Sequence, residues 1–113
     1  MSTATKGRAA EHEVRDLMES LGWYVVRSAS SKGHFDLICL PSLDAINPVS
    51  GVEWNYRWVG ISVKCGSSRD SPKDREVKSE VAKKHGGRCL FVRRRSGRLK
   101  PNEFRWIMEW GNT

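Results

Sequence analysis

Two short apolar segments decide how this chain folds: FDLICL at residues 35–40 and VGISVK at residues 59–64. Both have the length of β-strands and are rich in the β-branched and aromatic residues that strands favour. Side chains alternate between the two faces of a strand, so the second segment places its three β-branched residues on one face. Gly60, Ser62 and Lys64 then lie together on the other face.

Each segment also carries a charged side chain where a buried strand would have none. If the two strands pair, Asp36 and Lys64 converge at one end of a sheet. A carboxylate beside an ammonium group on rigid strands suits a divalent metal and a scissile phosphate. The alternative is a structural ion pair at the sheet edge, and the two segments taken alone favour it.

The composition indicates one small, strongly basic domain. The chain has 113 residues, with 20 Lys or Arg against 13 Asp or Glu and a net charge of +7. This length supports a single domain over residues 1–113 with a modest core, near the size at which dimerisation adds useful burial. The charge favours nucleic acid as partner over a membrane, because no basic amphipathic helix with a large apolar face is evident. A basic surface that only confers solubility is the alternative.

The three cysteines make a zinc site improbable. Cys39, Cys65 and Cys89 are widely spaced, and the sequence holds no CxxC or HxxxH pair. Cys39 and Cys89 lie in apolar strand segments and are interpreted as small core residues, which fits a reducing cytoplasmic setting. No segment has the features of a signal peptide or the length of a membrane span. We therefore expect a cytoplasmic protein; the resemblance described below implies a prokaryotic or phage-infected cell.

Periodicity and turn residues predict the order α-β-β-β-α-β-β. The helices are predicted from Gly7 to Leu21 and from Ser71-Pro72 to Gly86-Gly87. The strands are predicted at residues 23–27, 35–40, 59–64, 89–93 and 104–110. Residues 41–57 are predicted to form a surface connection and a hairpin. This order is compatible with an α/β fold of the restriction-endonuclease-like type, a mixed sheet flanked by helices with metal ligands at one end of the sheet.

The first predicted helix carries one acid beside its apolar stripe. At about 100° per residue, Glu11 falls beside Met18 at the margin of the stripe, whereas Glu13 lies farther away. A carboxylate that leans toward the core costs desolvation free energy unless it is paired or binds a metal. Glu11 is therefore the candidate acid of this helix, with solvation at the edge of the stripe as the alternative.

Several short motifs follow one another through the chain. They are KGRAAEHE at 6–13, GWYVVRSA at 22–29, Ser31-Lys32, Asp36-Leu37, Val63-Lys64, HGG at 85–87 and FRW at 104–106. In this order they resemble the archaeal-type Holliday junction resolvases of the PD-(D/E)XK nuclease superfamily. The resemblance covers nearly the whole chain except residues 41–57, a segment longer than the expected family hairpin. The ordered set is much more specific than any single motif.

The resemblance implies a homodimeric, magnesium-dependent endonuclease, with manganese as a possible substitute. Two active sites on one basic surface would nick opposing strands of a four-way DNA junction. The matching positions are the helix acid Glu11, the basic residue Arg27, the loop hydroxyl Ser31, the metal-binding acid Asp36 and the motif lysine Lys64. The metal ligands implied are Glu11, Asp36 and the backbone carbonyl of Val63.

These residue types suit the implied chemistry. A hard cation held by carboxylates keeps its waters, lowers the pKa of one of them and polarises the phosphate. Lys64 can orient the attacking water or stabilise charge on the pentavalent phosphate. Arg27 can hold a flanking phosphate through a two-pronged contact. The residues expected to contact DNA are Arg27, Lys6, Arg8, Lys32, Arg69, Lys73, Arg93, Arg94 and Arg95.

One position departs from the family pattern. The family motif is acid-x-lysine, and here Ser62 occupies the acid position two residues before Lys64. A neutral hydroxyl is a far weaker magnesium ligand than a carboxylate. The enzyme is active if Glu11 or Glu53 completes the site, or if Ser62 binds through water. Otherwise the chain is a junction binder without catalysis, or Ser62 is an introduced change that traps substrate. The active enzyme is favoured, because the other matching acids and basic residues remain.

Two further alternatives concern substrate and aromatic residues. A related nuclease acting on flaps, single-strand ends or duplex DNA is the alternative among enzymes. Trp106 and Trp110 near the C-terminus could stack on bases. Packing in the core and at a dimer interface is the favoured role for them, because alternating aromatic residues on a terminal strand commonly mark packing.

Overall fold

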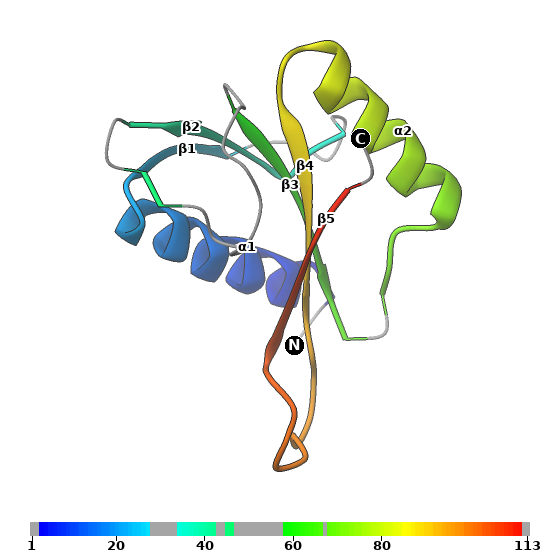
Figure 1. The fold of residues 1–113 in the computed structure, drawn as a ribbon. Helices are drawn as coiled ribbons and strands as arrows, with labels where there is room; N and C mark the ends of the chain where they lie inside the picture. The colour runs from blue at the N-terminus through cyan, green and yellow to red at the C-terminus, as the bar shows by residue number, and fades with distance from the viewer. Residues whose placement is uncertain (1–2, 28–33, 43–44, 47–57, 67, 112–113) are drawn as a thin grey trace.

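A computed structural model describes residues 3–27, 34–42, 45–46, 58–66 and 68–111. Its elements follow the predicted order: α1 (Thr3–Ser20), β1 (Trp23–Arg27), β2 (Leu37–Pro41), β3 (Val59–Cys65), α2 (Pro72–Lys84), β4 (Arg88–Arg94) and β5 (Trp106–Trp110). Figure 1 shows these elements as one sheet with α1 and α2 on opposite sides of it. No helix in the described ranges is long and apolar enough to cross a membrane.

The sheet is mixed, and its strands lie side by side in chain order from β1 to β5. Three neighbouring pairs are antiparallel, whereas β3 and β4 run parallel. A parallel pair needs a crossover connection, and α2 supplies it. Helix α1 packs against β1, β2 and β3, while α2 packs against β4. The predicted α/β arrangement, a mixed sheet flanked by helices, is confirmed.

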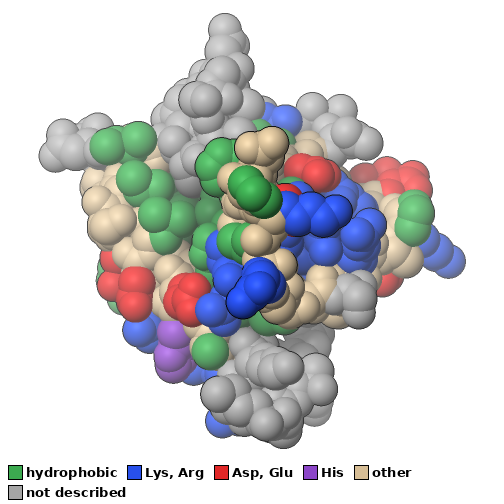
Figure 2. All heavy atoms as spheres, turned by 90° about the horizontal axis from the view of Figure 1, so that it is seen from below, with side chains coloured by type: hydrophobic (Ala, Val, Ile, Leu, Met, Phe, Trp, Pro, Cys, Tyr) green, Lys and Arg blue, Asp and Glu red, His purple; other side chains and the backbone are tan. Residues whose placement is uncertain are grey.

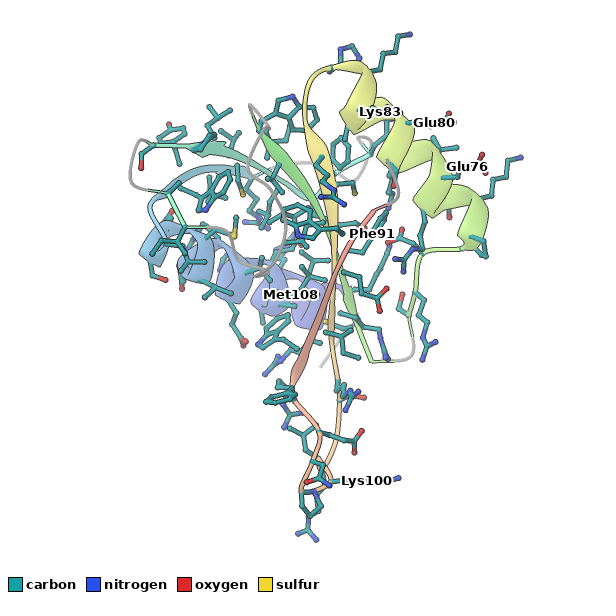
Figure 3. The ribbon with its side chains drawn as sticks, viewed as in Figure 1. Glu76, Glu80, Lys83, Phe91, Lys100 and Met108 are labelled. Atoms are coloured by element: carbon teal, nitrogen blue, oxygen red, sulfur yellow. The ribbon has the colours of Figure 1, made fainter. Side chains whose placement is uncertain are left out.

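Strand β3 is buried on both faces, and its side chains alternate as predicted. Val59, Ile61 and Val63 belong to the core cluster that includes Ala10 and Val14 of α1. The opposite face of the sheet is covered by a second cluster, made of Phe35, Ala82, Cys89 and Phe91. On the neighbouring strands, Phe91 of β4 belongs to the second cluster and Met108 of β5 packs against the first, and Figure 3 shows the two side chains on opposite sides of the sheet.

Strand β2 begins at Leu37, two residues later than predicted, because the chain bends at Asp36. In a regular strand residues 35 and 37 would share a face. Instead Leu37 enters the core cluster beside α1, whereas Phe35 packs in the cluster on the α2 side, edge-on to Trp58 at 5.5 Å between ring centroids. Because of the bend, the regular β2–β3 pairing begins only at Leu37, immediately after the acid.

Gly60 on β3 leaves the space that the Phe35 ring fills. A Cβ atom added at Gly60 would lie 2.6 Å from Cδ1 of Phe35. We expect Gly60→Ala to lower the free energy of unfolding by about 1–3 kcal/mol, the usual cost of overpacking a core. Urea unfolding measures this loss. Combining Gly60→Ala with Phe35→Leu should cost less than the two single changes added together, because the smaller side chain makes room. Simple additivity would contradict the account.

Candidate active site

Asp36 is anchored where β2 and β3 separate. Its backbone N–H donates to the carbonyl of Ile61 at 2.8 Å, and its Oδ2 accepts from the backbone N–H of Val63 at 2.7 Å. The carboxylate thus takes the place of a strand partner at the position immediately before Lys64. Two hydrogen bonds to a neighbouring strand hold this acid in a fixed position, as a metal-binding or catalytic carboxylate requires.

Glu11 of α1 lies within electrostatic reach of Asp36. Burial raises the pKa of Glu11, and the negative charge of Asp36 raises it further, while Arg27 is the strongest of the opposing cations. Nη1 of Arg27 also lies 3.1 Å from Nε2 of His12. Helix α1 and the ends of β1 and β2 therefore bring together two carboxylates and an arginine. A cation between the carboxylates would offset the cost of ionising both.

Lys64 faces the other side of the sheet. It lines a hollow of about 150 Å³ together with Asp70, Arg75 of α2 and Phe91 of β4. Val63, which anchors Asp36, directly precedes Lys64 in β3. Asp36 and Lys64 therefore lie at the same end of the sheet. Their surroundings differ, because Lys64 contacts the α2 side whereas Asp36 interacts with Glu11 of α1.

Ser62, at the acid position of the motif, is fully buried and has its hydroxyl occupied. Its Oγ donates to Oδ2 of Asp70 at 2.8 Å and accepts from Nζ of Lys78 at 3.0 Å. Lys78 also donates to Oδ1 of Asp70 at 2.5 Å, and the side chains of Asp70 and Lys78 are only 6% and 16% exposed. A carboxylate is thus present beyond Ser62, but it comes from the β3–α2 loop and is paired with a lysine.

Asp70 was not among the predicted site residues, because residues 66–70 have the composition of an ordinary polar loop. Nothing in a loop of that composition fixes the direction of one aspartate. The sequence signal that could have pointed to Asp70 is Lys78. The few apolar residues of α2 mark the side of the helix that faces the sheet, and Lys78 lies on that side. A lysine that points at a buried serine needs an anion nearby. The nearest preceding acid outside the helix is Asp70.

The Asp70 network makes the stability of the fold depend on pH. Burial alone would raise the pKa of Asp70, but the hydrogen bonds from Lys78 and Ser62 outweigh it and lower that pKa. A lowered folded-state pKa means that ionised Asp70 stabilises the fold fully above the unfolded pKa, and that this contribution is lost as the pH falls through the folded pKa.

We therefore expect the free energy of unfolding to fall less steeply with acidification in Asp70→Asn than in the wild type. Urea unfolding at pH 7 and at several values below about pH 4 measures both slopes, since ordinary aspartates titrate near there. The comparison cancels the other carboxylates, which both forms share. Parallel curves for the two proteins would show that Asp70 is not held in its charged form.

The described residues contain no group of three or more His, Cys, Asp or Glu side chains placed to hold a metal ion. Magnesium, however, usually keeps several waters and is bound through one or two carboxylates plus substrate phosphates. Glu11 and Asp36 are two carboxylates of this kind within electrostatic reach of each other, and their role as metal ligands stays a prediction. The backbone N–H of Val63 is engaged by Asp36, whereas its carbonyl as a metal ligand stays a prediction.

The three consecutive arginines expected to contact DNA point to different surroundings. Arg93 donates to the carbonyl of Gly66 at 3.0 Å, and Arg95 forms an ion pair with Glu103 at 2.6 Å. Arg94 instead pairs with an acid of α1, Glu13, at 3.3 Å. Alternation along β4 explains this division, since neighbouring side chains leave a strand in opposite directions.

The remaining predicted residues are spread over the surface or lie outside the described part of the chain. Arg8, Arg69 and Lys73 are exposed, and Arg69 lines the hollow beside Lys64. The side chains of Lys6, Ser31, Lys32 and Glu53 fall outside the described residues. Trp106 and Trp110 are half-buried and pack against the main core, which agrees with the favoured packing role.

Comparison with known proteins supports the fold. No protein-family model and no curated protein matches the chain. Among solved structures, the chain is similar to Hjc, a Holliday junction resolvase from the archaeal hyperthermophile Archaeoglobus fulgidus. The TM-score is 0.59, with 15% sequence identity over 91% of this chain and 70% of that one. At this identity the likeness shows the fold alone, and the restriction-endonuclease-like fold predicted from sequence is confirmed.

Proposed function

We propose that this chain is a structure-specific DNA endonuclease that resolves four-way junctions by metal-dependent, paired nicking. The observation that carries the proposal is the position of Asp36, which the hydrogen bond from Val63 holds beside β3 and which lies within electrostatic reach of Glu11. This pair stands on a fold shared with a junction resolvase. The basic composition, with a net charge of +7, supports a polyanionic substrate.

Glu11 and Asp36 are the residues that would hold the metal, which supplies an activated water and polarises the phosphate. Asp36 keeps its orientation through the Val63 N–H, so one of its oxygens remains for a ligand. Arg27, beside these acids, binds a phosphate next to the one that is cut. Magnesium is the preferred ion, because both side-chain ligands are carboxylates.

Lys64 and its arginine neighbours bind the DNA backbone on the other side of the sheet end. Arg69, Arg75 and Arg93 line the same hollow as Lys64. Lys64 also follows directly after Val63, which anchors Asp36, so at this end of the sheet it can stabilise negative charge on the phosphate that is cut. Two such sites are needed to cut opposing strands, so we propose that a homodimer acts in the cytoplasm on branched DNA.

A specific observation favours a second function, junction binding without cleavage. The hydroxyl of Ser62 is fully buried, donates to Asp70 and accepts from Lys78, so it is a poor ligand for a metal. If the motif acid is indispensable, the chain would recognise branched DNA and leave it intact. The two functions share the basic surface and differ only in turnover.

One experiment separates the two functions. A labelled four-way junction and a linear duplex of matched sequence are incubated with the protein, with magnesium or with a chelator. The proposed enzyme binds the junction more tightly than the duplex and nicks only the junction, and only with metal. Tight junction binding without nicking in magnesium or manganese supports the second function. Equal weak binding to both DNAs, lost together as salt rises, would contradict both.

A further inference from the structure

The hairpin that joins β4 to β5 carries the most exposed large hydrophobic side chain among the described residues. Phe104 is 80% exposed, whereas Phe35 and Phe91 are buried and Trp106 packs against the core. Figure 1 shows this hairpin extending well beyond the rest of the molecule. An aromatic ring left in water on a projecting hairpin has no packing role in the monomer.

The backbone that presents Phe104 is held in place by hydrogen bonds across the hairpin. The N–H of Arg95 donates to the carbonyl of Arg105 at 2.7 Å, and the Arg105 guanidinium donates back to the carbonyls of Arg95 and Gly97. Glu103 accepts from the N–H of Lys100 and pairs with Arg95. Both neighbours of Phe104 in the chain are therefore fixed, so the ring is displayed from an ordered support.

Positive charge surrounds the ring. Between residues 93 and 105 the sequence has six Lys or Arg and one acid. Figure 2 looks toward this end of the molecule and shows Lys and Arg side chains gathered there. A groove on one side of the hairpin is lined by Arg69, Arg93, Arg95 and Arg98. Figure 3 shows Lys100 at the hairpin end, directed away from the body of the protein.

We propose that Phe104 stacks on a base face exposed at the branch point of DNA, while the arginines of the hairpin hold the flanking phosphates. Aromatic rings stack on any base, because every base has a π-face, and such stacking combines with a basic groove in proteins that bind unpaired strands. In intact duplex the base faces are covered by their neighbours. The hairpin would thus distinguish branched from linear DNA, a specificity that rests on the function proposed above.

The test compares Phe104→Ala with the wild type in equilibrium binding to a four-way junction and to a matched duplex, without metal so that nothing is cut. We expect Phe104→Ala to weaken junction binding about 5- to 150-fold, the range that one aromatic–base stack supplies. Duplex binding and the dependence on salt should stay unchanged, since no phosphate contact is removed. Phe104→Trp should restore junction binding.

Tyr24→Ala is the matched control, because Tyr24 is also an exposed aromatic residue, at 69%, but lies on β1. It should leave both affinities unchanged. Provided that the wild type binds junctions, two results for Phe104→Ala would overturn the proposal. One is an equal loss of affinity for junction and duplex, and the other is no loss of affinity for either. A wild type that binds no junction would instead contradict the function itself. A thermal melt confirms that each variant is folded.

Discussion

Lys64→Ala should abolish most junction cleavage while leaving junction binding nearly intact. Lys64 is half-buried at the end of β3, in a hollow with three arginines and Asp70. A cation that acts on charge developing in the transition state contributes to turnover more than to ground-state binding. Removing one such electrostatic group costs about 100- to 1000-fold in rate in comparable cases. Single-turnover nicking of a labelled junction measures the loss.

Lys83→Ala is the control for the change in net charge, because Lys83 is an exposed lysine of α2. It should cleave at a rate close to that of the wild type. If Lys64→Ala lowers binding and cleavage by the same factor, Lys64 is a phosphate anchor only. If Lys64→Ala cleaves normally, the assignment of the active site to this end of β3 is wrong.

Asp70→Ala should lower the free energy of unfolding by about 3–5 kcal/mol, because it leaves Lys78 as an unpaired, mostly buried charge. It also removes the acceptor of the buried Ser62 hydroxyl. By comparison, Asp16→Ala should cost no more than about 1 kcal/mol, since Asp16 is 67% exposed and its ion pair is with the adjacent Arg15 on the surface. Urea unfolding measures both variants.

A double variant decides whether the position of the acid matters or only its charge. Ser62→Asp alone would bury a second carboxylate beside Asp70 and should be strongly destabilised. Ser62→Asp combined with Asp70→Ser returns the acid to the motif position and keeps Lys78 paired, so it should recover most of the lost stability. If the double variant is no more stable than Ser62→Asp alone, the described network of Ser62, Asp70 and Lys78 is contradicted.

The fold was largely predictable, because its signals are local. The alternating residues of β3 indicate its two faces, and Ser71 followed by Pro72 indicates where α2 begins. The expected N-cap hydrogen bond, from the backbone N–H of Asp74 to the Ser71 hydroxyl, is present. The beginning of β2 was misplaced, because the bend at Asp36 follows from the fit of Phe35 into the space above Gly60. That fit joins residues from different strands, and no local pattern records it.

The site was predictable only in part. The place of Glu11 on the helical stripe singled it out as a candidate, and the structure puts it within electrostatic reach of Asp36, while its role in the site stays a prediction. The pairing of Asp70 with Lys78 depends on how the β3–α2 loop returns to the sheet, which sequence periodicity does not specify. The division of Arg93 and Arg94 between two faces follows from strand alternation, whereas the sequence analysis expected both residues to contact DNA.

The most direct test of the central claim is cleavage of a supercoiled plasmid that extrudes a cruciform from an inverted repeat. Paired nicking across the junction by a dimer converts this plasmid directly into linear DNA in the presence of magnesium. The account predicts linear product that depends on the inverted repeat and disappears in Lys64→Ala. Nicked circles formed equally from a plasmid without the repeat would contradict it, as would an intact cruciform plasmid.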